Sequence, residues 1–100
     1  MIVEVRGDRS VVLLEPRDTR SFKLVAPAGL GEADLARALA GIGDIAGGHA
    51  WVAAAWVREA SGLACSAEWR EAFGKMLDYA RSKDWVRATD EAIRAHIERR

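Results

Sequence analysis

The sequence predicts an α+β fold in which an N-terminal three-stranded antiparallel meander (residues 1–26) is followed by three to four helices (residues 31–100) packed on one of its faces. Two observations lead to this prediction. The first quarter of the chain contains short apolar runs separated by turn residues, which is typical of strands. The last third contains an apolar stripe at steps of three and four, which is typical of an amphipathic helix. With 100 residues, half of them apolar, the chain suits a single domain with its own core.

The meander is predicted from three apolar segments. The outer two alternate apolar and polar residues, as strands with one buried face do. The middle one, Val11–Leu14, is continuously apolar, so we expect it to lie in the centre of the sheet, covered on both sides. If helices pack on one face only, Val11 or Leu13 lies on an exposed apolar surface. The strands are expected over residues 2–6, 11–14 and 21–25, with turns at residues 7–10 and 16–19.

Helical signals follow the turn that ends the meander. The strongest begins after Ser66, a residue type that caps helix N-termini, and its apolar stripe comprises Trp69, Ala72, Phe73, Met76, Leu77 and Ala80. Thr89, which precedes two acidic residues, predicts the start of a last helix with Ile93 and Ile97 facing inward. Further helices are expected over residues 31–42 and 52–61, while residues 49–52 fit a strand as well as a helix.

Charge and cysteine content narrow the functional classes. Fifteen basic and fifteen acidic residues balance, and no basic stripe is present for nucleic acid. No apolar run is long enough for a signal peptide or a membrane span. The single cysteine, Cys65, cannot form an intrachain disulfide, which suits a reducing compartment. Together with a bias towards arginine and alanine, this predicts a cytoplasmic bacterial protein that binds neither nucleic acid nor membrane.

The cluster of four glycines in residues 41–48 is the candidate for a ligand loop. A phosphate loop needs glycines ahead of a helix N-terminus, where backbone amides can approach the anion. Here the glycines follow a predicted helix, and Asp44 would repel a phosphate. A helix C-cap followed by a turn explains the same residues.

His49 follows this cluster and forms, with Asp44, the candidate catalytic pair. Imidazole titrates near neutral pH and a carboxylate can orient it, as general acid–base catalysis requires. A structural role explains His49 as well, and likewise His96 on the last predicted helix. Two distant histidines and Cys65 lack metal-ligand spacing, so we expect neither a metal nor a cofactor. These observations favour a protein that is not an enzyme.

Trp51 and Trp56 are the candidates for contact with a ligand or partner. On one helix they would point about 140° apart, so both would not share a small core. If Trp51 lies on a strand, the two side chains are no longer fixed at this angle and both can reach the core. Otherwise one of them faces a partner, a pocket or a second subunit, because tryptophan is enriched at interfaces. The core is the first expectation for Trp56, and an interface or a pocket for Trp51.

Three functions stay open at this point. The leading one is association, as a homodimer or as a subunit of a complex, through the apolar surface of Val11–Leu14. The alternative is a small enzyme or small-molecule-binding protein whose pocket lies near Gly41–Gly48 and uses His49 and Trp51. The third is peptide binding by strand addition at the edge formed by Ser21–Val25.

Overall fold

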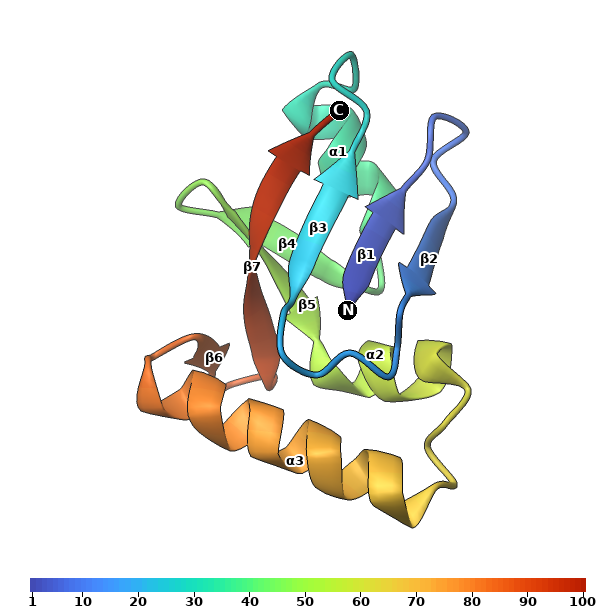
Figure 1. Cartoon of the computed structure of the whole chain (residues 1–100). Helices are drawn as coiled ribbons and strands as arrows, with labels where there is room; N and C mark the ends of the chain where they lie inside the picture. The colour runs from blue at the N-terminus through green and yellow to red at the C-terminus, as the bar shows by residue number, and fades with distance from the viewer.

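Seven strands in one mixed sheet, together with three helices, make up the fold (Figure 1). The computed structural model describes every residue from Met1 to Arg100. The strands are β1 (Ile2–Val5), β2 (Val11–Leu14), β3 (Lys23–Ala26), β4 (Gly43–Ala46), β5 (His49–Ala53), β6 (Val86–Arg87) and β7 (Ala92–Arg99). The helices are α1 (Glu32–Ala38), α2 (Ala54–Ser61) and α3 (Ala67–Ser82). The strand order is β2-β1-β3-β7-β5-β4, and β6 pairs with β7 beside this path.

The prediction of an N-terminal antiparallel meander is wrong. β1 and β2 form an antiparallel hairpin, but β3 lies on the other side of β1 and runs parallel to it. β2 is therefore an edge strand rather than the central one. The run Val11–Leu14 misled the prediction because only one face of β2 packs on the core, and all four residues remain half-buried. Since β3 is enclosed between β1 and β7, the segment Ser21–Val25 offers no free edge for strand addition.

The predicted last helix is instead β7, the longest strand. β7 pairs with β5 along its first half and with β3 along its second half. Ile93 and Ile97 are four residues apart, which fits a helix. Ala95 between them is fully buried, however, and Arg94 and His96 alternate with these three residues. This spacing has the period of two that a strand requires.

The two central helices are confirmed. α3 begins after Ser66, whose Oγ accepts a hydrogen bond from the backbone N–H of Trp69 at 3.2 Å, as an N-cap does. α2 starts directly after β5, so residues 49–52 belong to a strand. α1 ends at Ala38, earlier than predicted, because the chain turns into β4.

The glycine cluster forms a hairpin. Gly47 and Gly48 connect β4 to β5 with φ angles of 62° and 79°. Positive φ at both positions is what a two-residue hairpin turn requires. A Cβ atom at Gly43 would collide with the backbone carbonyl of Trp51 on β5. These glycines therefore allow two strands to turn and to lie close together.

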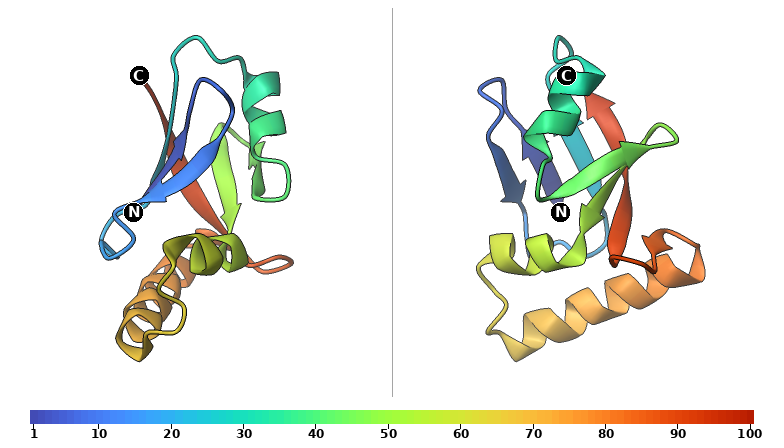
Figure 2. Two further views of the ribbon diagram at one scale, coloured as in Figure 1. Left: turned by 90° about the vertical axis from the view of Figure 1, so that its right-hand side faces the viewer. Right: turned by 180° about the vertical axis from the view of Figure 1, so that it is seen from behind.

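β7 joins two half-sheets that face each other across the core (Figure 2). β1, β2 and β3 lie on one side of it, and β4 and β5 on the other. α1 lies at one end of this arrangement, while α2 and α3 lie at the opposite end, so the helices do not pack together on one face of the sheet. The largest fully buried side chains are Phe73, Met1, Leu24, Leu35 and Leu39. None of the helices combines the length and the apolar character that a membrane span requires.

Candidate ligand groove

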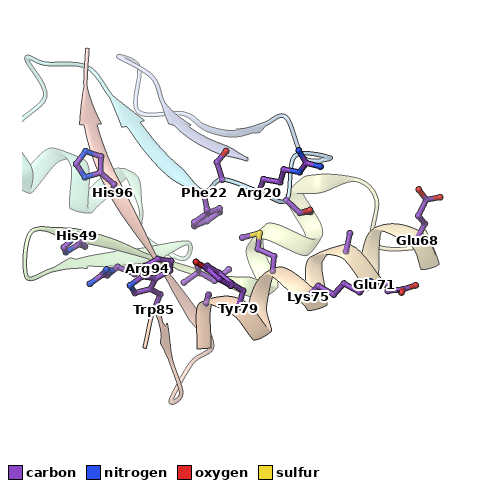
Figure 3. Close-up of a pocket in the computed structure, with 16 residues that line it drawn as sticks. Arg20, Phe22, His49, Glu68, Glu71, Lys75, Tyr79, Trp85, Arg94 and His96 are labelled. Carbon is purple, nitrogen blue, oxygen red and sulfur yellow. Dashed lines mark ion pairs between the residues drawn. The ribbon is translucent and has the colours of Figure 1, made fainter. Parts of the chain in front are cut away.

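A groove of about 820 Å³ lies between α3 and the segment that leads into β3 (Figure 3). Arg94 and two histidines lie at one end of it, and Glu68 and Glu71 at the other. Between these ends its lining is largely apolar. The apolar lining residues come from the segment before β3, from α3, from the turn before β6 and from β7: Phe22, Ala72, Met76, Tyr79, Ala80, Trp85 and Ile93.

α3 forms one wall of the groove, because residues three and four positions apart lie on the same side of a helix. Trp69, Phe73 and Leu77 in the centre of its apolar stripe are buried in the core. Ala72 and Met76 at the edge of the stripe, together with Tyr79, border the groove. Tyr79 is 59% exposed and is the one large apolar side chain that lies mostly in solvent. Its ring meets that of Trp85 edge-on, with 6.0 Å between the centroids. The groove therefore contains apolar surface that nothing in the chain covers.

The opposite wall, residues 19–22, is held by specific hydrogen bonds. The indole Nε1 of Trp69 donates to the carbonyl oxygen of Pro16 at 2.8 Å, which ties this segment to α3. The backbone N–H of Arg20 donates to the Asp18 carboxylate at 3.0 Å. This bond is the main cause of the lowered pKa of Asp18, so the carboxylate stays ionised and fixes the turn. Arg20 thus projects from a defined backbone position.

The β7 end of the groove carries the two histidines. Ala50 on β5 and Ala95 on β7 are register partners, so their neighbours His49 and His96 lie on the same face of adjacent strands. Both histidines border the groove (Figure 3). The sequence left open whether they approach each other, and the sheet register brings them to one place.

Arg94 lies beside these histidines, half-buried, with its guanidinium 5.4 Å from the centroid of the Trp85 ring. Neither Arg94 nor Arg20 forms an ion pair with any carboxylate of the chain. Lys75, by contrast, pairs with Glu71 at 3.5 Å. The groove therefore has two arginines whose charge the protein does not neutralise.

The predicted pair of Asp44 and His49 does not form. Asp44 lies opposite Trp51 in the sheet register, and its carboxylate accepts hydrogen bonds from Arg87, including one from Nη1 at 3.1 Å. Arg87 also donates to Asp90 at 2.7 Å. These hydrogen bonds lower the pKa of both carboxyl groups and raise that of the guanidinium. Asp44 is part of a closed ion cluster and does not orient His49.

The two candidate tryptophans lie outside the groove. Trp51 is half-buried on β5, where its Nε1 donates to the carbonyl oxygen of Ala46 at 3.4 Å and Arg87 lies 5.4 Å from its ring centroid. Trp56 is half-buried on α2 and packs against the core, as expected first. The pocket that the sequence predicted beside Gly41–Gly48 thus shares only His49 with the groove in the structure.

The remaining candidates for partner contact lie on β2. Val11 and Leu13 turn their side chains towards the core and pack against it. Val12 and Leu14 therefore point to the outer face of the sheet, because side chains alternate along a strand. Cys65 is exposed and unpaired in the turn before α3.

Sequence reasoning missed the arginines of the groove. Arg94 was assigned to a helix, so its position beside His49 could not be inferred. The alternation of apolar and polar residues from Ile93 to Ile97 was the one signal that could have placed it. Arg20 carried no signal, because its position depends on how the segment before β3 crosses beneath the sheet.

Comparison with family models, with curated proteins and with solved structures finds no match to this chain. The structure also brings together no group of three His, Cys, Asp or Glu side chains with the geometry of a metal site. The chemistry of the groove itself is therefore the basis for proposing a function.

Proposed function

We propose that the protein binds a small organic anion with an apolar body in the groove beside α3. The supporting observation is that Arg20 and Arg94 border an apolar groove and have no carboxylate partner. An unpaired guanidinium can donate to a carboxylate, sulfonate or phosphate, and such charge-assisted hydrogen bonds are stronger than neutral ones. The apolar lining would remove the body of the same ligand from water.

The dimensions of the groove support a ligand of moderate size. Its volume of about 820 Å³ lies within the range of small-molecule sites. The residues of α3 that border it run from Glu68 to Ala80, a rise of about 18 Å along the helix. The acidic residues at the Glu68 end would repel an anion. We therefore place the anionic group near Arg94 and the apolar body along α3.

Binding, rather than catalysis, is the activity that these contacts support. General acid–base work by histidine needs an orienting partner for the imidazole. No side-chain hydrogen bond joins His49 or His96 to a carboxylate, and Asp44 is occupied by Arg87. In this proposal the two histidines contribute hydrogen-bond donors beside Arg94, and the ligand leaves unchanged.

A pair of fluorescent probes tests this proposal. 8-Anilinonaphthalene-1-sulfonate is an organic anion with an apolar body, and N-phenyl-1-naphthylamine is a close analogue without charge. In fluorescence titrations, Arg94→Gln should weaken binding of the sulfonate by about five- to tenfold, the loss of one exposed charge-assisted contact. Arg20→Gln should weaken it by less, because Arg20 lies further along the groove, towards Lys75 (Figure 3). Binding of the neutral analogue should change by less than about twofold, because its apolar contacts are unaffected.

Arg17→Gln is the matched control. Arg17 is exposed, forms no ion pair and lies in the same segment as Arg20, but does not border the groove. Its substitution should leave the affinity for the sulfonate unchanged. Equal losses in the Arg17 and Arg94 variants would mean that the probe responds to net charge alone, and the proposal would fail. Native mass spectrometry of protein purified gently from cells would then identify any ligand retained.

A further inference from the structure

The outer edge of β2 is an unpaired strand edge made of four apolar residues. β2 ends the strand order and pairs only with β1. In the left view of Figure 2, which faces this side of the molecule, β2 lies in front of the other strands. Sheet edges usually carry charges, prolines or bulges that discourage pairing, and Val11–Leu14 has none of these within it. The other end of the sheet, β4, carries Asp44.

The hydrogen bonds of the β1–β2 hairpin show which backbone groups are free at this edge. The N–H of Arg6 donates to the carbonyl oxygen of Ser10, so Ser10 faces β1. Backbone groups point to alternate sides along a strand, which means that Val12 and Leu14 also face β1. The N–H and C=O groups of Val11 and Leu13 consequently point outward, and no hydrogen bond to them is present from the rest of the chain.

We propose that two copies of the chain associate through β2, antiparallel and about a twofold axis at Val12. Antiparallel pairing of a strand with itself is symmetric, so one edge supplies both the donors and the acceptors. With Val12 opposite its own copy, Val11 of each protomer lies opposite Leu13 of the other. All the free groups of both edges are then paired, in four backbone hydrogen bonds (a count that follows from two such residue pairs).

The charges at the two ends of β2 fit this register. Arg9 precedes the strand and Glu15 follows it, and both are exposed. Placing Val12 on the axis brings Arg9 of each copy to the same end of the shared strands as Glu15 of the other, so one Arg9–Glu15 ion pair can form at each end. Glu15 has no ion-pair partner within its own chain. Arg9 and Glu15 have positive φ angles of 68° and 50°, which limit the extended segment to the residues between them.

This second copy is a partner of the sheet edge and uses no residue of the groove. On the outer face, the two Val12 side chains would meet at the axis, flanked by Leu14 of each copy. On the inner face, Val11 and Leu13 would extend the core contacts of one protomer to the next. The proposed dimer can therefore be tested independently of ligand binding.

The oligomeric state should be measured by sedimentation velocity over a concentration series, without added ligand. Val12→Lys places two ammonium groups opposite each other at the axis and should raise the dimer dissociation constant at least about tenfold. Val12→Thr keeps the branched shape without charge and should leave the dimer in place. Far-ultraviolet circular dichroism of both variants checks that the fold is kept.

A charge-exchange cycle tests the register. Arg9→Glu and Glu15→Arg each create two like-charge contacts in the dimer and should each raise the dissociation constant about tenfold. The double variant restores opposite charges and should return it to within about threefold of the original. Arg9 also pairs with Asp34 of its own chain at 3.1 Å, so the thermal midpoint of each variant is compared separately.

Amide hydrogen exchange gives an independent measurement for which no substitution is needed. Protection of the Val11 and Leu13 amides should rise with protein concentration, while the Val12 and Leu14 amides, already bonded to β1, should change little. A protein that stays monomeric up to about 1 mM would overturn the proposal. A dimer that Val12→Lys leaves intact, or a double variant no tighter than the singles, would overturn it as well.

Discussion

Arg87 and Arg94 lie on neighbouring strands and both stack on tryptophan rings, but their charges have different partners. Arg87 contacts Trp51 and donates hydrogen bonds to two carboxylates, those of Asp44 and Asp90. Arg94 contacts Trp85 at the same distance, 5.4 Å from the ring centroid, and has no carboxylate partner. The first arginine is neutralised within the fold, whereas the second borders the groove.

This difference separates a structural arginine from one that is available to a ligand. An arginine with two carboxylate partners has few donors left, and an incoming anion would have to displace them. A guanidinium held over an aromatic ring without an acid has free donors in a fixed orientation. Four experiments can break or sharpen this comparison.

The largest effect is expected for Arg94→Glu. The substitution removes the attraction for the anionic group and adds a like charge, so the affinity for 8-anilinonaphthalene-1-sulfonate should fall by about fiftyfold, or roughly 2.3 kcal/mol. Fluorescence titration measures this loss. The same substitution at Arg87 should change the affinity by less than about threefold. A similar loss at both positions would remove the distinction between the two arginines.

Arg87→Gln should affect stability instead of binding. It leaves Asp44 and Asp90 without their cation, and because all three side chains are partly exposed we expect a loss of about 1 kcal/mol of unfolding free energy, the upper end for such pairs. Urea denaturation at pH 7 measures the loss. Arg94→Gln is the matched control and should unfold at nearly the same urea concentration as the original protein.

The Arg87 cluster also predicts how stability depends on pH. Hydrogen bonds from Arg87 lower the pKa of Asp44 and of Asp90 in the folded state. Their contribution is therefore fully present above the unfolded-state pKa of about 4 and is lost as the pH falls through the lower folded-state values. Urea titrations between pH 6 and pH 2 should show a smaller decline for Arg87→Gln. Parallel declines in the two proteins would contradict this assignment.

The smallest effect is expected for Lys75→Gln. Lys75 borders the groove, but Glu71 neutralises it in an exposed pair at 3.5 Å. The affinity for the sulfonate probe should change by less than about twofold, because such a pair contributes little in water. A loss as large as that for Arg94→Gln, measured in the same titration, would place the anionic group beside Lys75, away from Arg94.

The sequence predicted the elements whose patterns fit only one structure. The stripe of α3 and its Ser66 cap are found where expected, since more than four turns of consistent spacing leave little ambiguity (a length that follows from its 16 residues). The segment from Ile93 to Ile97 is short and apolar at both helical and strand positions. This segment forms a strand because it pairs with β3 and β5. Local propensity does not reveal such pairing.

The groove was predictable only in part, for the same reason. The sequence identified His49 as a candidate site residue, whereas for His96 it did not predict a position near His49. Whether they lie together depends on the β5–β7 register, in which the paired residues Ala50 and Ala95 are 45 positions apart in the chain. Arg20 reaches the groove because β3 lies on the other side of β1 from β2, so the segment that connects them crosses the end of β1. Long-range pairing of this kind leaves no trace in a single sequence.

The central position of β7 has a consequence for how the chain folds. Both half-sheets depend on this strand: Lys23 pairs with His96, and Val52 with Ile93. The hairpins β1–β2 and β4–β5 can form early from local contacts, but neither can close the core by itself. Contacts so distant along the chain slow folding. During synthesis on the ribosome, the two hairpins would therefore leave the exit tunnel before β7 does. Their apolar faces would stay exposed to water until residues 92–99 emerge and pair with them.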